Sequence, residues 1–230
     1  MKTAGIIGGL GPETTAEFYM ELNFSCQKID PANRPPLLIW NVPLDYKTAE
    51  DLLVSNTGQE RYIPFLVDAA KRLEKGGADF LVMPCNTLHI FIEEIRSAVS
   101  IPVLSVVEET ASFLAAKEIP EVGLLATSTT LDQGLYASAL QQKGIAQHVP
   151  NGFEQAKIGK MISNLVLSRH DNKDREDLIR VIEGFAENGI KTVILACTDL
   201  QLLLPHHAQM EIHDTMKILA DATVREIVNI

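Results

Sequence analysis

Two cysteines occupy corresponding places in two similar stretches of the chain. Cys85 follows the apolar run Phe80–Met83, and Cys197 follows the apolar run Val193–Leu195. Both runs have the length and composition of a buried strand in a parallel sheet, and open α/β sheets bind ligands at the carboxyl ends of such strands. We therefore expect both thiols to lie at a ligand-binding edge.

The residues after each cysteine favour a reactive thiolate. Asn86 and Thr87 follow the first cysteine, and Thr198 follows the second. Their polar groups, together with the dipole of a helix that begins there, stabilise negative charge on sulfur. One such thiol is typical of a covalent nucleophile, whose partner base is usually histidine. His89 is close to the first cysteine in sequence, which keeps that alternative open.

Two such thiols in repeated units indicate a different chemistry. If the units face each other across a ligand, their sulfurs lie on opposite sides of it. One sulfur then removes a proton from a carbon atom and the other returns a proton to the opposite face, which is racemisation by two bases. Two thiolates at close range repel, so the resting pair would share one proton. A buried structural thiol is the alternative for either cysteine alone, and it is the role that we expect for Cys26.

The repetition extends beyond the cysteines, which are 197 − 85 = 112 residues apart in a chain of 230. The strand-turn-helix pattern at Gly5–Thr15 returns at Gly123–Thr130, with an offset of 123 − 5 = 118 residues. Two similar offsets favour duplication of a half-chain α/β unit. Resemblance among unrelated strand-helix units is the simpler alternative.

Two turns at strand ends have the residues to bind an anionic group. Gly9 and Gly11 can take up positive φ angles and present main-chain N–H groups ahead of Pro12, which suits the first turn of a helix. The turn lacks the Gly-x-Gly-x-x-Gly pattern of dinucleotide sites, so a small carboxylate is the expected ligand. The hydroxyl-rich turn Thr127–Thr130 allows either carboxylate recognition or plain helix capping.

Apolar periodicity and turn residues locate the other elements. We expect strands at residues 3–8, 37–42, 101–104, 122–126, 145–148 and 210–212. We expect helices at 13–28, 59–75, 88–99, 108–117, 154–167, 178–188 and 215–228, with a charged, solvated turn at 169–177.

Composition limits the class of protein. The net charge is −10 with no Lys/Arg run, so we expect no nucleic-acid partner. No apolar stretch approaches the roughly 20 residues of a membrane helix, and the first residues read as a strand and turn and not as a signal peptide. Three widely spaced cysteines form no disulfide framework, which favours the cytoplasm. The adjacent His206 and His207 lack metal-ligand spacing, so no metal site is expected.

Five motifs together resemble the cofactor-independent aspartate/glutamate racemase family, and most closely its aspartate racemase branch. They are Gly8–Glu13, Pro84–Thr87, Val107–Thr110, Gly123–Thr127 and Cys197–Asp199. The resemblance implies an α/β fold of two similar lobes related by pseudo-twofold symmetry, each a four-stranded parallel sheet flanked by helices. It implies a first lobe of residues 1–102 and 212–230, a second of residues 103–211, and an active site between them. It also implies a homodimer that uses neither pyridoxal phosphate nor a metal.

The same resemblance implies roles for the site residues. Cys85 and Cys197 would be the acid and base groups. The residues that would hold the substrate carboxylate and ammonium are Asn86, Thr87, Thr127, Thr130 and Thr198. Gly9 joins this substrate-binding set because of the anion-binding turn described above.

Two positions depart from the aspartate racemase pattern. The loop at residues 45–48 reads Asp-Tyr-Lys-Thr, where aspartate racemases usually have Pro-Asp-Arg-Thr. Lys47 thus replaces an arginine implicated in binding a carboxylate, and it keeps the charge but loses the two-pronged fit. Leu167, with Arg169 nearby, stands where those enzymes place a lysine.

The function that we expect is racemisation of an acidic amino acid, aspartate first, with Lys47 binding the side-chain carboxylate. Alternatives within the superfamily are a glutamate or broad-specificity amino-acid racemase, a hydantoin racemase, an arylmalonate decarboxylase and a maleate isomerase, which adds a cysteine to an alkene. A protein of another class, which binds an amino acid without turning it over, is the third hypothesis.

Overall fold

The chain folds into two compact units. The computed structural model describes residues 1–44, 58–167, 169–203 and 210–229. The first unit comprises residues 1–109 and 216–230, and the second comprises residues 110–215. The sequence-based expectation placed the boundaries after residues 102 and 211. In the structure the chain passes from one unit to the other after residues 109 and 215. Lys47 lies outside the described residues.

The first unit is built on a parallel sheet with the strand order β2-β1-β3. Its strands are β1 (Ala4–Gly8), β2 (Leu37–Asn41) and β3 (Phe80–Val82). The fourth strand expected at 101–104 is reduced to a single parallel bridge between Leu81 and Val103. Leu81 donates to the Pro102 carbonyl and accepts from the Leu104 N–H, at 2.8 and 2.9 Å. Pro102 has no N–H to extend this pairing, so the expectation of four strands in this sheet is corrected to three and a bridge.

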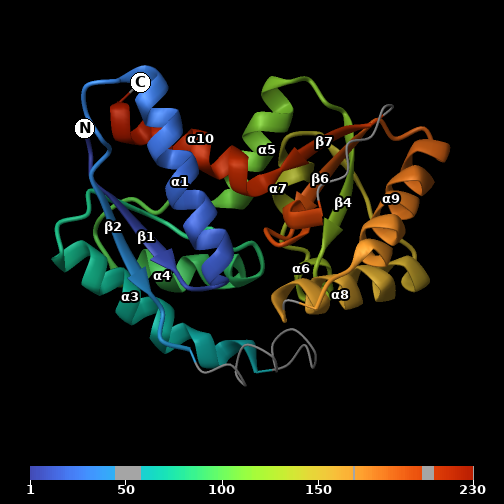
Figure 1. The fold of residues 1–230 in the computed structure, drawn as a ribbon, viewed down its shortest axis with the longest axis horizontal. Coiled ribbons are helices and arrows are strands. Elements are labelled where there is room, and N and C mark those ends of the chain that lie inside the picture. The colour runs from blue at the N-terminus through green and yellow to red at the C-terminus, as the bar shows by residue number, and fades with distance from the viewer. Residues whose placement is uncertain (45–57, 168, 204–209, 230) are drawn as a thin grey trace. The chain divides into compact units, whose positions relative to one another are not determined.

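Helices cover both faces of this sheet. Right-handed crossovers from β1 to β2 and from β2 to β3 run in opposite directions across the sheet, so α1 and α3 lie on opposite faces. Figure 1 shows this arrangement, with α3 packed on β1, β2 and α4. The expected helices at 13–28 and 59–75 are confirmed. The helical elements are α1 (Pro12–Ile29), η1 (Gln59–Tyr62), α3 (Ile63–Lys75), η2 (Thr87–Phe91), α4 (Ile92–Ala98), α5 (Val106–Ala116), which contains the first boundary, and α10 (Thr215–Val228), which begins at the second boundary.

The second unit repeats the topology of the first. Its parallel sheet has the order β5-β4-β6-β7, so in both sheets the first strand along the chain lies between the second and the third. The predicted repetition of an α/β unit is thereby confirmed at the level of topology. Its elements are β4 (Glu121–Ala126), α6 (Ser128–Asp132), α7 (Ala137–Gln142), β5 (Ala146–His148), α8 (Gly152–Val166), α9 (Asn172–Glu187), β6 (Thr192–Ala196), η3 (Leu200–Leu203) and β7 (Glu211–Asp214).

The start of α9 corrects one sequence-based expectation. Residues 169–177 were expected to form a solvated turn, yet α9 begins at Asn172. The Asp171 carboxylate accepts the N–H groups of Lys173 and Asp174, and the Asp174 carboxylate accepts the Asp171 N–H in return. This capping box satisfies main-chain donors that would otherwise lack partners, so the charged stretch begins a helix.

No helix in the described ranges is long and apolar enough to cross a membrane.

Candidate active site

The first thiol lies at the carboxyl end of the first sheet. Val82 of β3 pairs with Ile6 of β1, so Cys85 and Gly9, each three residues further on, lie at the same edge. Cys85 is partly exposed, and its N–H donates to the Met83 carbonyl at 2.8 Å. The predicted position of this cysteine at the carboxyl edge of its sheet is confirmed.

His89 holds the main chain of Cys85 from the protein interior. It is 1% exposed, and its Nδ1 lies 2.6 Å from the Cys85 carbonyl oxygen. Its Nε2 accepts the N–H of Val106, the first residue of α5, at 3.1 Å. A neutral imidazole has one donor and one acceptor nitrogen, so the proton resides on Nδ1 and is donated to Cys85. Burial lowers the pKa of His89 from 6.5 to about 4, although the hydrogen bond with the Cys85 carbonyl opposes the shift.

This arrangement removes the cysteine-histidine pair that sequence left open. Both ring nitrogens of His89 are engaged with main-chain groups, and neither is directed to the thiol of Cys85 as a proton acceptor. His89 therefore does not serve Cys85 as a general base.

Arg96 also holds the start of α5. Its guanidinium donates to both carboxylate oxygens of Glu108, at 2.8 and 2.7 Å, and to the Val103 carbonyl at 3.2 Å. The hydrogen bonds from Arg96 hold the pKa of Glu108 below its ordinary value. The helix start that His89 contacts is thus held by a second, two-pronged contact.

The turn after β1 is closed by its own side chains. Gly9 has a φ of +82°, as expected, and an added Cβ there would lie 2.7 Å from Asn41 Oδ1. Its N–H donates to Thr15 Oγ1 at 2.9 Å, and the same hydroxyl donates to the Gly11 carbonyl. Gly11 has a φ of −128° and not the positive angle expected. The Gly9 N–H is therefore occupied by Thr15 here, which weakens the anion-binding interpretation of this turn.

Asn86 and Thr87 form the start of η2, directly after Cys85. Their exposed fractions are 2% and 8%, and the Asn86 carbonyl accepts the N–H of His89 at 2.9 Å. Both polar side chains are thus placed beside the first thiol by a short, tightly bonded helix.

The second thiol lies at the equivalent edge of the second sheet. Ala126 of β4 pairs with Ala196 of β6, so Thr127 and Cys197 follow the strand ends at the same level. Cys197 is 6% exposed, and its carbonyl accepts the N–H of Leu200, which opens η3. Thr198 is buried beside it. The predicted place of this cysteine is also confirmed.

The hydroxyl of Thr127, at the same edge as the second thiol, caps a helix. Thr127 Oγ1 accepts the N–H of Thr130 at 3.2 Å and lies 2.9 Å from the hydroxyl of Thr130. Thr127 is the N-cap of α6, and both side chains are buried. The capping interpretation is confirmed, and carboxylate recognition by the same hydroxyls stays a prediction.

A carboxylate accompanies the second thiol. The Sγ of Cys197 lies 4.0 Å from Asp199 Oδ2, a long contact in which the thiol donates. A negative charge this close favours the protonated thiol over the thiolate.

A model of the Asp/Glu/hydantoin racemase family matches residues 7–223. The chain belongs to this family. The broad specificity amino-acid racemase RacX of Bacillus subtilis is 30% identical over 229 residues, which cover 96% of each chain. An aspartate racemase homologue from Pyrococcus horikoshii has a TM-score of 0.80 at 28% identity and covers 99% of this chain and 100% of its own. Picrophilus torridus aspartate racemase has a TM-score of 0.79 at 26% identity and covers 99% of this chain and 95% of its own.

These similarities confirm the predicted family and its fold of two α/β units. In this chain, each unit brings its own predicted site residues to one sheet edge. The first edge holds Gly9, Cys85, Asn86 and Thr87, and the second holds Thr127, Thr130, Cys197 and Thr198.

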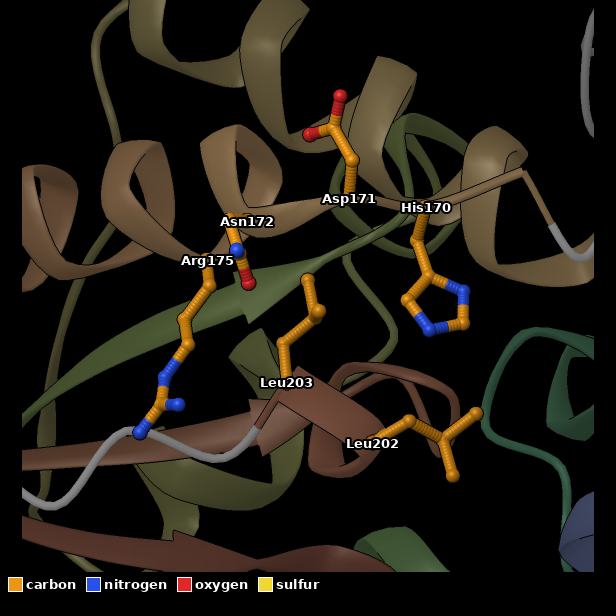
Figure 2. A pocket seen from close by; sticks show the side chains of 6 residues that line it. All are labelled: His170, Asp171, Asn172, Arg175, Leu202 and Leu203. Carbon is orange, nitrogen blue, oxygen red and sulfur yellow. The ribbon is translucent and has the colours of Figure 1, made fainter.

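An open pocket of about 390 Å³ lies in the second unit, between the start of α9 and η3 (Figure 2). Figure 2 shows His170 and Leu203 directed into it, whereas the Asp171 carboxylate turns away toward the helix start that it caps. The pocket therefore presents the imidazole of His170 and the apolar side chain of Leu203. Its lining residues are His170, Asp171, Asn172, Arg175, Leu202 and Leu203.

The position that departs from the aspartate racemase pattern is at the end of α8. Leu167 is the C-cap of that helix, and its N–H donates to the Ser163 carbonyl at 3.1 Å. The Arg169 N–H donates to the Asn164 carbonyl at 2.7 Å. These bonds fix the chain direction at the helix end, where Leu167 is partly buried.

Sequence reasoning missed the roles of His89 and Asp199. Asp199 was part of a motif but received no role, although it adjoins the second thiol in sequence. His89 was left open as the partner base of Cys85, and sequence did not reveal its main-chain contacts, because the contact with Val106 joins residues 17 positions apart. Within the described residues, no group of three His, Cys, Asp or Glu side chains is placed to hold a metal ion.

Proposed function

We propose that this chain is a cofactor-independent amino-acid racemase that acts on aspartate, with Cys85 and Cys197 as its two acid and base groups. The observation that carries the proposal is the equivalent placement of the thiols. Each follows the third strand of its own sheet, level with the turn that follows the first strand. Family membership supports racemisation as the reaction class.

The chemistry assigns one proton transfer to each sulfur. A thiolate takes the Cα proton from one face of the substrate, and the thiol of the other cysteine delivers its proton to the opposite face. After turnover the two sulfurs have exchanged protonation states, so the reverse reaction starts from the other cysteine. Asn86 and Thr87 would bind polar groups of the substrate on one side, and Thr127, Thr130 and Thr198 on the other.

Aspartate is the substrate that we place first. Two similar solved structures bear the names aspartate racemase homologue and aspartate racemase. Lys47 would take the side-chain carboxylate, which a single ammonium group binds less selectively than an arginine. Gly9 would contribute through its main chain, in competition with the Thr15 hydroxyl.

A broad-specificity amino-acid racemase is the second candidate. The curated relative that matches across 96% of this chain carries that name. The residues Lys47 and Leu167 favour it, because the first loses the two-pronged fit of an arginine to a carboxylate and the second is apolar where aspartate racemases place a lysine. This candidate predicts turnover of neutral amino acids as well.

We also propose that the protein is a homodimer, as the family resemblance implies. Sedimentation equilibrium distinguishes a monomer of 25.3 kDa from a dimer of twice that mass. A monomer at assay concentration would contradict this part of the proposal.

Incubation with each L-amino acid in deuterated water, without added cofactor, tests the function. A racemase incorporates deuterium at Cα while the D-enantiomer accumulates, and chiral chromatography with mass spectrometry detects both. Exchange with aspartate alone supports the first candidate, and exchange with neutral amino acids supports the second. Thermal stabilisation by aspartate without any exchange would show a binding protein and overturn the proposal.

A further inference from the structure

The main chain of Cys85 is held at both of its hydrogen-bonding groups. Its N–H donates to the Met83 carbonyl at 2.8 Å, and its carbonyl accepts from His89 Nδ1 at 2.6 Å. The first bond is local, between residues two positions apart. The second comes from a ring that is 1% exposed and is itself anchored to another helix.

The donor and acceptor roles in this chain of contacts are fixed by the main chain. Val106 N–H can only donate, so Nε2 of His89 must accept it and carry no proton. The Cys85 carbonyl can only accept, so Nδ1 must carry the proton and donate it. One neutral tautomer therefore satisfies both contacts, and a doubly protonated ring would lose the contact with α5.

The contact with Cys85 also orients the following peptide group. The peptide between Cys85 and Asn86 is trans, so its C=O and N–H point in opposite directions. Because His89 draws the Cys85 carbonyl toward the interior, the Asn86 N–H points away from His89. The orientation of the peptide plane between Cys85 and Asn86 is thus set by the buried side chain of His89.

We propose that His89 is a positioning residue for Cys85, which directs the thiol and the adjacent Asn86 N–H through the hydrogen bond from Nδ1 to the Cys85 carbonyl. This inference rests on the proposed function in one respect, since it treats Cys85 as one of the acid and base groups. His89 itself touches no reacting atom.

A structural role is the alternative that the test must separate. His89 also accepts a first-turn N–H of α5, one of the donors that a helix leaves without an internal partner. If this second contact were its whole purpose, His89 would act as a distant cap for α5 and would matter for stability alone.

Two substitutions separate the contact made by Nδ1 from the contact made by Nε2. In His89→Asn the carboxamide nitrogen lies near the position of Nδ1, which keeps the donor to Cys85 and removes the acceptor for Val106. In His89→Gln the longer carboxamide reaches the position of Nε2, which keeps an acceptor for Val106 and removes the donor to Cys85. Each variant is thus the control for the other.

The readouts are the alkylation rate of Cys85 by iodoacetamide between pH 6 and 9, assigned by peptide mass spectrometry, and kcat and KM for aspartate. Both are measured well below the unfolding midpoints of the two variants. His89→Gln should lower kcat at least about tenfold with KM within about threefold, and should change the Cys85 alkylation rate more than about threefold. His89→Asn should stay within about twofold of the unmodified protein in both rates.

Equal Cys85 alkylation in the two variants, or a larger change in His89→Asn, would overturn the positioning role and leave only the capping role. The alkylation contrast does not depend on turnover. A protein that racemises no amino acid but shows the contrast refutes the proposed function and upholds the positioning role. A protein that racemises aspartate but lacks the alkylation contrast upholds the proposed function and refutes the positioning role.

Discussion

The Nδ1 atom of His89 lies 2.6 Å from the carbonyl oxygen of Cys85, four residues before it in the chain. The histidine nearest the first thiol in sequence therefore binds its main chain and does not act as a base on its sulfur. This fits a racemase better than a cysteine nucleophile activated by histidine.

The neutral state of His89 predicts how stability changes with pH. Its pKa is 6.5 in an ordinary environment and about 4 in the folded protein. Between these values the unfolded chain binds a proton that the folded protein does not, so stability falls as pH falls through this window. Between pH 7 and pH 5 the free energy of unfolding should drop by about 2 kcal/mol more in the unmodified protein than in His89→Asn. Urea denaturation at each pH measures both.

Parallel pH profiles for these two proteins would show that the pKa of His89 is the same in the folded protein and the unfolded chain, and would contradict this prediction. The comparison between variants is needed because burial also lowers the pKa of His213, which contributes a slope of the same sign to both.

Gly9 is predicted to be intolerant of any side chain. Its φ of +82° strains an L-residue, and an added Cβ would meet Asn41 Oδ1 at 2.7 Å and the Val42 nitrogen at 3.0 Å. Gly189 has a similar φ of +85° with no atom within 4 Å of an added Cβ, so it is the matched control. Gly189→Ala should cost about 1 kcal/mol from the backbone alone, and Gly9→Ala at least about 2 kcal/mol more.

Chemical denaturation of the two glycine variants measures this difference. Equal losses would mean that the turn after β1 yields to the added methyl group, and that crowding against β2 does not constrain this edge of the sheet.

Asp199 is predicted to restrain the reactivity of Cys197. The carboxylate oxygen lies 4.0 Å from the sulfur and opposes the thiolate. Asp199→Asn should raise the rate of Cys197 alkylation by about threefold or more near neutral pH. Glu187→Gln, which removes an exposed carboxylate at the end of α9, is the control for a change of net charge. An unchanged or slower rate in Asp199→Asn would exclude an electrostatic role for this carboxylate.

Sequence patterns predicted the parts of the fold that depend on local chemistry. Apolar runs located the strands before Cys85 and Cys197, and the glycine-bearing turn located the start of α1. The repeated context of the two cysteines indicated two units with one topology, which the sheets β2-β1-β3 and β5-β4-β6-β7 share.

Features that depend on distant partners were beyond the reach of these patterns. The charged residues 171–177 resemble a solvated loop until Asp171 and Asp174 cap each other's main chain. The segment 101–104 has strand composition, but Pro102 limits its pairing to one bridge. The role of His89 required Val106, which no local pattern connects to it.

Replacement of each cysteine by serine, followed by measurement of aspartate racemisation in deuterated water, tests the central claim most directly. Cys85→Ser and Cys197→Ser should each lower the rate at least about a thousandfold, since each removes an acid or base group, while both remain folded. Cys26→Ala is the control, because that thiol is fully buried in α1, and it should retain racemisation. Full activity in either serine variant would contradict the mechanism with two cysteines.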